Sequence, residues 1–291
     1  MDWLEFDFGG GFPHELEEMI PVEKSMKTMK YQNTDHTFSV CAYKESEYLE
    51  ELLISLMTQT VRTNIIIVTS TPNQHINSLA KKYGLPVYVN TGEKGIAGDW
   101  NFALRSARTP LVTIAHQDDI YEPEYVSEIL AAVNRAKDPI IAFSHYAELR
   151  EGEKVYKNRL LQIKKIMMVP IRLSNNSIFL RRRSLSLGNP ICCPAVTYVK
   201  GRVADFDPVF VNNLDWNQWE RLSKQKGSFV YVPKALMCHR IHKDSTTSEM
   251  IENKIRGQED VVIFRRFWPK VIAERIARIY GTSEKSNSLD I

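Results

Sequence analysis

Two adjacent carboxylates, Asp118 and Asp119, directly follow a short apolar run and are the residues of this sequence best suited to chemistry. The run, Leu111–Ala115, is rich in β-branched residues, which is typical of a strand buried on both faces. Open α/β sheets bind ligands at the carboxyl ends of such strands. Neighbouring carboxylates repel each other unless a cation or water reaches both. A divalent cation, Mn²⁺ or Mg²⁺, with a phosphate completing its shell would satisfy the pair. The alternative is a solvated acidic turn that caps the following helix.

A third carboxylate and a basic segment lie further along the chain. Asp215 begins the sequence DWNQWERL, in which apolar residues recur at a spacing of three, as in an amphipathic helix. In the segment HRIHK, Arg240 and His242 alternate, so an extended backbone would place both side chains on one side. Arg240 and Lys243 carry positive charge that could bind an anionic group through charge-assisted hydrogen bonds.

Alternating strands and helices must position these residues. Strand-like apolar runs occupy 37–42, 64–69, 85–90 and 111–115, and stripes of apolar residues with spacings of three and four fall between them. This order, with short connections, predicts an α/β fold with a parallel sheet covered on both faces by helices. A further strand is expected over 139–146, after which the alternation is less regular.

The order and spacing of FSVCAYKESEYLEELLISL, LVTIAHQDD, LDWNQWERL and HRIHKDSTTS resemble those of family 2 glycosyltransferases of the GT-A fold. The resemblance runs from Thr37 to Ser248. It implies a nucleotide-sugar-binding half (37–138) and an acceptor and catalytic half (139–248). Residues 1–36 would be an N-terminal extension, and 249–291 a basic amphipathic helical region with a tail.

The same resemblance implies contacts to the donor. The resemblance favours UDP as the nucleotide. Many family members have an aspartate after the second strand, whereas this chain has Ser70 between two threonines, and this departure weakens the preference for UDP over other nucleotides. Tyr43 would stack on the base; its alternative role is that of an aromatic at the strand boundary. The glycine-bearing loop with Gly98 would let the backbone approach the bound nucleotide closely; its alternative role is that of an ordinary helix start with Asp99 as the cap. The residues expected to bind the nucleotide sugar are Ala42, Tyr43, Glu45, Ser70, Gly98, Asn101, His116, Gln117, Arg240 and Lys243.

Metal binding and catalysis are also assigned by resemblance. The family's metal motif is usually Asp-x-Asp, and here His116 stands at the first acidic position. The cation is therefore expected to bind Asp118, with Asp119 as helper or cap and His242 completing the shell. Asp215 matches the aspartate of a Glu-Asp motif whose glutamate is replaced by Leu214. In an inverting transfer Asp215 would remove the proton of the acceptor hydroxyl; its alternative role is to cap its helix.

These features predict an enzyme that moves a hexose from a nucleotide-diphosphate sugar to a hydroxyl of a saccharide or lipid-linked saccharide, in the assembly of a cell-surface glycan or polysaccharide. One alternative is a nucleotidyltransferase that makes a sugar nucleotide, but the glycine- and lysine-rich phosphate loop expected of it is missing. Another is a catalytically silent glycan- or nucleotide-binding module, which Leu214 and His116 would suit.

Composition limits the remaining classes. A net charge of +3 is too small to imply nucleic acid binding. The four cysteines show no CxxC spacing, and neither a signal peptide nor a long apolar run is seen, so we expect a cytoplasmic protein. Residues 264–280 mix aromatic and aliphatic residues with arginines. They would lie on the inner face of a membrane, or pack on their own domain or on another subunit of a homo-oligomer.

Overall fold

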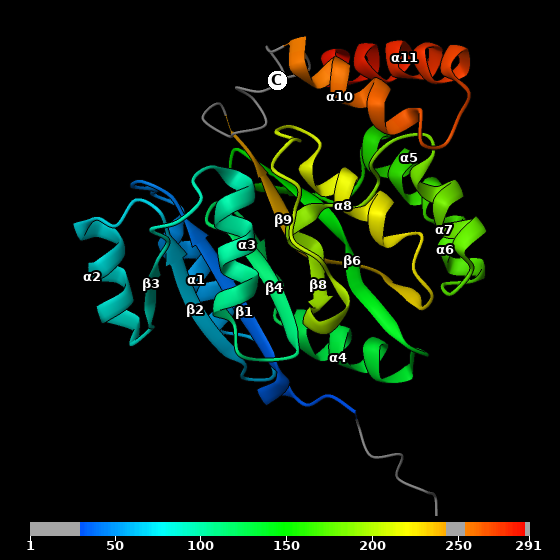
Figure 1. Ribbon diagram of the computed structural model, residues 1–291. Helices are drawn as coiled ribbons and strands as arrows, with labels where there is room; N and C mark the ends of the chain where they lie inside the picture. Colours follow the sequence, from blue (N-terminus) through cyan, green and yellow to red (C-terminus); the bar gives the residue numbers. More distant parts are fainter. Residues whose placement is uncertain (1–29, 243–253, 289–291) are drawn as a thin grey trace, which may run out of the picture. The chain divides into compact units, whose positions relative to one another are not determined.

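The described chain from Tyr31 onward is built around a mixed sheet with the strand order β3-β2-β1-β4-β8-β6-β9-β5, and β7 pairs with β6 (Figure 1). A computed structural model describes residues 30–242 and 254–288. The strands are β1 (His36–Ala42), β2 (Asn64–Thr69), β3 (Val87–Val89), β4 (Leu111–His116), β5 (Ile120–Tyr121), β6 (Pro139–Arg150), β7 (Glu153–Val155), β8 (Val196–Val199) and β9 (Ser228–Ile241).

Strands β1 to β4 form the parallel half. β1 pairs in parallel with β2 on one side and with β4 on the other, and β2 pairs in parallel with β3. β1 and β4 are buried almost along their whole length. For β4 this follows from its apolar, β-branched composition, whereas β1 also buries polar side chains. The predicted parallel sheet is confirmed, and the third strand is shorter than expected.

The second half of the sheet runs partly antiparallel. β8 pairs antiparallel with both β4 and β6, whereas β6 and β9 run parallel. The short strand β5 follows the turn after β4 and pairs antiparallel with the last part of β9, with Ile120 opposite Cys238. This pairing brings the carboxyl end of β4 beside the carboxyl end of β9, although more than a hundred residues separate them in the sequence.

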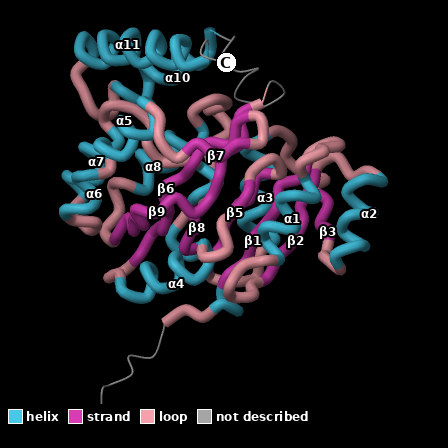
Figure 2. Tube along the Cα trace, turned by 180° about the vertical axis from the view of Figure 1, so that it is seen from behind, coloured by secondary structure: helices cyan, strands magenta, loops and turns pink. Residues whose placement is uncertain are grey.

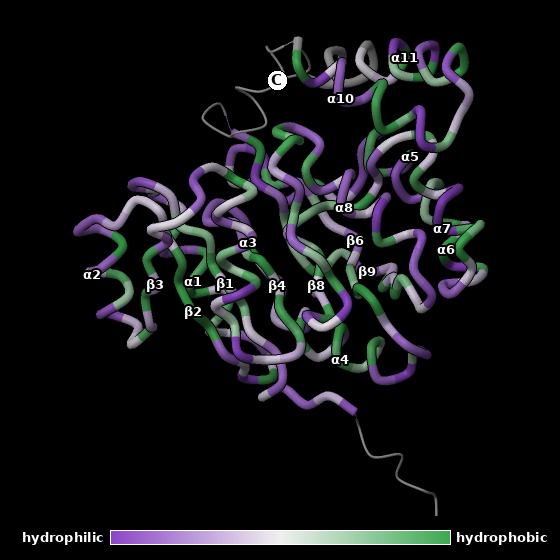
Figure 3. Tube along the Cα trace, in the orientation of Figure 1, coloured by the Kyte–Doolittle hydropathy of each residue, from purple (hydrophilic) through white to green (hydrophobic). Residues whose placement is uncertain are grey.

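Helices cover both faces of the sheet, as Figures 1 and 2 show. One core contains residues of α1, α2 and α4, and the other contains residues of α3, α7, α8, α10 and α11. Figure 3 shows hydrophobic stretches along the central strands. The helices are α1 (Leu49–Met57), α2 (Gln74–Tyr83), α3 (Ile96–Ser106), α4 (Tyr125–Arg135), α5 (Arg159–Met167), α6 (Val169–Leu173), α7 (Ile178–Leu185), α8 (Leu214–Leu222), α10 (Lys254–Phe264) and α11 (Lys270–Ser288).

The C-terminal helices α10 and α11 pack on the same chain. Phe264, Ala273 and Ala277 are buried in the core that also holds Trp216, and the rings of Trp216 and Phe264 meet edge to face at 4.9 Å. Of the two arrangements considered for residues 264–280, packing on their own domain is therefore present. None of the described helices combines the length and apolar character needed to span a lipid bilayer.

Candidate active site

Asp119 is the inner of the two adjacent carboxylates and faces β9. Its side chain is fully buried, Oδ1 accepts a hydrogen bond from the backbone N–H of Arg240 at 3.0 Å, and the same oxygen lies 2.9 Å from Nδ1 of His239. Oδ2 lies 4.0 Å from Nδ1 of His116. Helix α4 begins only at Tyr125, so the alternative that Asp119 caps this helix is wrong. Asp119 instead joins the end of β4 to β9.

Asp118, by contrast, is partly exposed and contacts His242. Its Oδ2 lies 3.0 Å from Nε2 of His242, so the structure brings together two of the three residues assigned to the metal. Burial acts to raise the pKa of Asp118, but the nearby His116 and His239 and the hydrogen bond with His242 outweigh it and hold that pKa below its ordinary value. Asp118 is thus kept as a carboxylate.

Arg240 is bound to protein groups from several elements. Nε donates a hydrogen bond to the backbone oxygen of Asp118 at 2.8 Å, and a terminal nitrogen pairs with the carboxylate of Glu51 on α1. The guanidinium also lies over the ring of Tyr48, 4.3 Å from its centroid. Arg240 therefore clamps the end of β4 to α1. Lys243, the other cation expected at the diphosphate, lies outside the described residues.

Tyr43 leads the loop after β1 and is about half exposed. Its backbone N–H donates to Oε1 of Gln117 at 2.8 Å, and Nε2 of Gln117 donates to the backbone carbonyl oxygen of Tyr43 at 3.0 Å. The next residue, Lys44, has a positive φ of 55° and donates its N–H to the Thr71 hydroxyl. The side chain of Gln117 thus holds the backbone of the loop at Tyr43, and the ring of Tyr43 remains exposed to solvent at the edge of the sheet.

The two other residues predicted in this loop differ in exposure. Ala42 is buried in the core beneath the sheet edge, so only its backbone faces the loop. Glu45 is exposed on the loop surface. Of these residues, only Tyr43 presents an exposed aromatic ring on which a base could stack.

Asp99 supplies a carboxylate at the end of β2, where the sequence has none. Its Oδ2 accepts a hydrogen bond from the Ser70 hydroxyl, and its Oδ1 accepts one from Nδ2 of Asn90, both at 2.8 Å. Helix α3 begins at Ile96 with Gly95 as its cap, so the alternative that Asp99 caps the helix is wrong. Sequence reasoning missed this residue as a partner of Ser70 because the two are distant in the sequence.

Gly98 is required by the protein backbone itself. A Cβ built at this position would lie 2.2 Å from the backbone oxygen of Glu93, which no real contact allows. The sequence argument explained this glycine by close approach to a nucleotide. The structure adds a nearer reason, because the loop of residues 90–95 folds back against the first turn of α3.

Asn101 and Trp100 connect α3 to the second half of the sheet. The buried amide of Asn101 donates to the backbone oxygen of Phe206 at 3.0 Å and accepts from its N–H at 2.7 Å. The indole of Trp100 stacks on His116, with centroids 5.1 Å apart and planes inclined by 23°. Asn101 therefore holds the chain before α8, and Trp100, which sequence reasoning missed, orients the histidine at the end of β4.

Asp215 lies in the first turn of α8 and is held by a loop residue that no sequence signal indicated. Asn189 Nδ2 donates to its Oδ2 at 2.7 Å, and the N–H of Trp216 donates to its Oδ1 at 2.7 Å. Asn213 stands at the N-cap without a side-chain capping hydrogen bond, so Asp215 is not the N-cap residue, although it accepts a backbone N–H of the first turn of α8. Burial raises the pKa of Asp215, although both hydrogen bonds oppose the shift.

His116 links the carboxylates electrostatically. Burial lowers the pKa of its imidazole, and the charges of Asp119, Asp118 and Asp215 act in the opposite direction. The carboxylate of α8 is therefore close enough to the end of β4 to act on the same imidazole. Asp215, whose pKa is raised by burial, and Asp118, whose pKa is held low, therefore both act on the imidazole of His116, and these opposite shifts suit a base and a charge-binding group respectively.

Solved structures with the same fold are glycosyltransferases. The mannosyltransferase PcManGT from Pyrobaculum calidifontis, in complex with GDP-Man and Mn²⁺, has a TM-score of 0.58 at 16% identity, covering 87% of this chain and 74% of that one. Residues 1–349 of TarS from S. aureus give 0.57 at 13% identity, covering 83% of this chain and 69% of that one. The described residues thus adopt the GT-A fold of these nucleotide-diphospho-sugar transferases.

The family follows from the sequence comparison. The model of glycosyl transferase family 2 matches residues 37–205, which is more than half of the chain, and the chain belongs to this family. A protein from Haemophilus influenzae described as an uncharacterized glycosyltransferase is 23% identical over 230 residues. That alignment covers 72% of this chain and 66% of the relative, slightly less than two thirds of the relative's length. The chain is accordingly a family 2 glycosyltransferase.

Proposed function

We propose that this glycosyltransferase moves a hexose from a nucleotide-diphosphate sugar to a saccharide hydroxyl, with inversion at the anomeric carbon. The observation that carries the proposal is Asp215, a buried carboxylate whose pKa is raised by that burial and whose charge acts on the imidazole of His116, as do those of the carboxylates following β4. A base works best when its pKa approaches the operating pH, and burial moves Asp215 in that direction.

The base of the donor would stack on Tyr43. Base stacking on an aromatic ring needs an exposed face held in place, and the reciprocal hydrogen bonds between Gln117 and the Tyr43 backbone provide this. UDP is the favoured nucleotide. TarS has been crystallised with UDP-GlcNAc, and glucosyl-3-phosphoglycerate synthase from Mycobacterium tuberculosis, which shares the fold at a TM-score of 0.52, with UDP. The sugar itself is left to experiment.

A divalent cation, Mn²⁺ or Mg²⁺, would bind at Asp118 and His242. Among residues 30–242 and 254–288, no group of three or more His, Cys, Asp or Glu side chains is arranged to hold a metal ion. Magnesium sites, however, commonly use one or two carboxylates and take their other ligands from water and substrate phosphates. Asp118 supplies one carboxylate of that type of site, whereas His242 would add an imidazole nitrogen, a ligand less suited to Mg²⁺ than a carboxylate. The cation would supply charge to stabilise the departing diphosphate. The mannosyltransferase PcManGT was crystallised with Mn²⁺.

In the transfer, Asp215 removes the proton of the acceptor hydroxyl. The acceptor oxygen forms its bond to the anomeric carbon while the bond from that carbon to the diphosphate oxygen breaks, and the electron pair leaves with the diphosphate. Asn189 holds the accepting carboxylate, and Trp100 stacks on His116 at the end of β4. The helix N-terminus around Asp215 favours the charged form before the proton arrives.

The substitution Asp215→Asn tests this role. Because the amide keeps the shape of the side chain without its basicity, we expect transfer to fall by at least about a hundredfold, while the thermal shift produced by UDP-sugar with Mn²⁺ stays close to that of the wild type. The control is Asp205→Asn, an exposed carboxylate paired with Arg105. Unchanged turnover in Asp215→Asn would remove this residue from the mechanism.

A catalytically silent binding module is the second candidate, and one observation favours it. Leu214, at the position of the family's glutamate, is buried in the core and offers no acid. Transfer or donor hydrolysis above the background of an Asp118→Asn/Asp215→Asn double variant would exclude it.

The acceptor would be a saccharide or lipid-linked saccharide of a cell-surface glycan, reached by peripheral contact with the inner face of the membrane.

A further inference from the structure

The segment from Lys154 to Ala204 contains no aspartate or glutamate. The whole chain has a net charge of only +3, so its positive charge is concentrated in this stretch. It includes α5, α6 and α7, which contact one another in the structure (Figure 1). The basic residues of the segment are Lys154, Lys157, Arg159, Lys164, Lys165, Arg172, Arg181, Arg182, Arg183, Lys200 and Arg202.

Apolar side chains on α5 and α6 face outward. Ile163, Ile166, Val169 and Leu173 are all exposed, and Ile166 and Leu173 reach 69% and 75%. Their spacing of three, three and four places them on one face of a helix, because Met168 between α5 and α6 keeps helical dihedral angles. Phe179 on α7 is also 66% exposed. We call these five residues the apolar stripe.

The opposite face of the same helices makes the contact with the protein. Leu161, Met168 and Ile171 are buried, with at most 1% of each side chain exposed. At about 100° per residue they project away from the apolar stripe. The stripe is therefore additional to the face that packs on the domain, so the packing of α5 and α6 does not account for it.

Cations border the apolar stripe without pairing to acids. Among the residues that the structure describes, Arg159, Lys165 and Arg172 form no salt bridge with a carboxylate, whereas Arg182 pairs with Glu220 in the core. Lys165 and Arg172 are two helical turns apart, so they lie along the same border of the stripe. An anionic surface is the complement that such unpaired charges favour.

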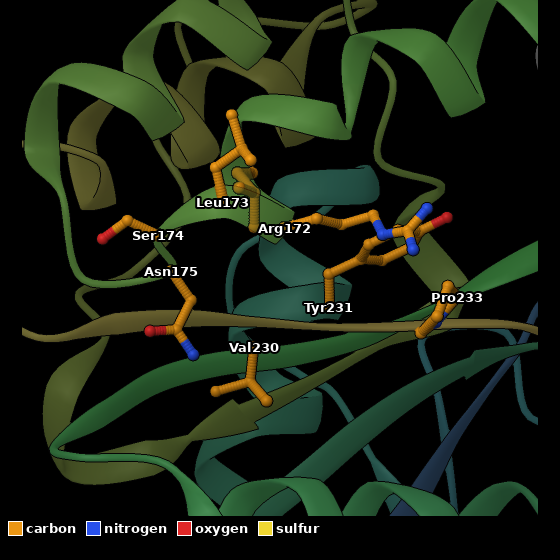
Figure 4. Close-up of a pocket in the computed structure, with 8 residues that line it drawn as sticks. Arg172, Leu173, Ser174, Asn175, Val230, Tyr231 and Pro233 are labelled. Carbon is orange, nitrogen blue, oxygen red and sulfur yellow. The ribbon is translucent and has the colours of Figure 1, made fainter.

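A polar hollow of about 460 Å³ adjoins the stripe between α6 and β9. Figure 4 shows Arg172 and Tyr231 extending in the same direction within it, with Ser174 and Asn175 on the other side. The hydroxyl of Tyr231 is buried and has no hydrogen-bond partner among the described residues, and burial raises its pKa to about 12, so it stays a donor. The hollow thus offers an O–H donor and a guanidinium to one acidic group.

We propose that the apolar stripe and its bordering cations form a docking surface for an anionic lipid membrane. The aliphatic side chains would enter the boundary between headgroups and acyl chains, and Arg159, Lys165 and Arg172 would contact lipid phosphates, one of which fits the hollow beside Tyr231. A second copy of this chain is a poorer occupant, because a twofold interface would place the same cations opposite one another. The surface differs from residues 264–280, whose Phe264, Ala273 and Ala277 are used in packing.

The docking would bring the enzyme to lipid-linked acceptors, and this consequence rests on the proposed function. Binding itself is independent of catalysis. Co-sedimentation of the full chain with vesicles of phosphatidylcholine alone, or of phosphatidylcholine mixed with phosphatidylglycerol, measures it without any glycosyl transfer. We expect binding to the anionic vesicles only, weakened by high salt. Failure to bind would overturn the docking surface while leaving the glycosyltransferase proposal intact.

Matched variants locate the surface. Ile166→Ser/Leu173→Ser removes two exposed apolar side chains and should weaken vesicle binding by about tenfold. Lys165→Gln/Arg172→Gln should weaken it by a similar factor on anionic vesicles. The control Val271→Ser/Ile279→Ser removes two equally exposed residues of α11 and should leave binding unchanged. The proposal would be overturned by loss of binding in the α11 variant alone. Equal binding of the wild type to neutral and anionic vesicles would also overturn it.

Discussion

Asn189 donates a hydrogen bond from Nδ2 to Oδ2 of Asp215 over 2.7 Å, and thereby joins the loop after α7 to the first turn of α8. This bond favours the charged carboxylate, whereas burial raises its pKa. The substitution Asn189→Ala removes the donor, so the pKa of Asp215 should rise further. Because the base must be deprotonated, the acidic limb of the kcat/KM profile should move to higher pH.

The pH profile distinguishes this effect from a general loss of structure. A variant that is merely less stable would lose activity at all pH values without moving the limb. An acidic limb at the same pH in wild type and Asn189→Ala would mean that another group governs it.

Asp118 and Asp119 should respond differently to the same substitution. Asp119→Asn leaves buried partners on β9 incompletely satisfied and is expected to lower the free energy of unfolding by about 1–3 kcal/mol. Asp118→Asn should hardly change stability but should abolish the Mn²⁺ dependence of UDP binding. His242→Ala should weaken this Mn²⁺ dependence without abolishing it. Calorimetric titration with and without EDTA measures the binding, and thermal unfolding measures the stability. Equal Mn²⁺ dependence in wild type and Asp118→Asn would place the cation elsewhere.

Tyr43 should contribute to donor affinity through its ring alone. Tyr43→Ala removes the exposed stacking surface and is expected to raise KM for the nucleotide sugar by about tenfold with little change in kcat. Tyr43→Phe, which keeps the ring, should behave as the wild type. Steady-state kinetics on the three proteins decide the matter, and an equal KM in all of them would mean that the base lies elsewhere.

Gly98→Ala should destabilise the protein, although an alanine usually stabilises a helix relative to glycine. The added Cβ would meet the backbone oxygen of Glu93, which cannot move without opening the loop before α3. We expect a loss of about 1–3 kcal/mol in denaturant unfolding. Gly201→Ala, where nothing lies within 4 Å of the new Cβ, is the control and should be neutral.

His36 should make the fold sensitive to acid. Its ring is buried between Thr63 and Thr113, and burial lowers its pKa from 6.5 to about 3. The unfolded chain therefore takes up a proton first as the pH falls below 6.5. The contribution of neutral His36 to the free energy of unfolding is fully present above pH 6.5. It decreases as the pH falls to about 3, with a slope of up to about 1.4 kcal/mol per pH unit. Chemical unfolding of wild type and His36→Gln across this range should show a shallower slope in the variant.

Local composition was sufficient to predict the parallel half of the sheet. Leu111–Ala115 is buried within β4, which pairs with β1 and β8, as an apolar, β-branched run predicts, and the two carboxylates follow the carboxyl end of that strand. Asp118 and His242, assigned to one site from the resemblance, are in contact.

The tertiary structure alone decided which partners each polar side chain of the site contacts. The difference between Asp118 and Asp119 arises because β9 returns to β5, so that the backbone of Arg240, 121 residues away, meets one carboxylate and not its neighbour. Asn189 and Asp99 acquired their partners in the same way. Hydrogen bonds between distant segments depend on how strands pair and helices pack, and these arrangements have no signature in the local sequence.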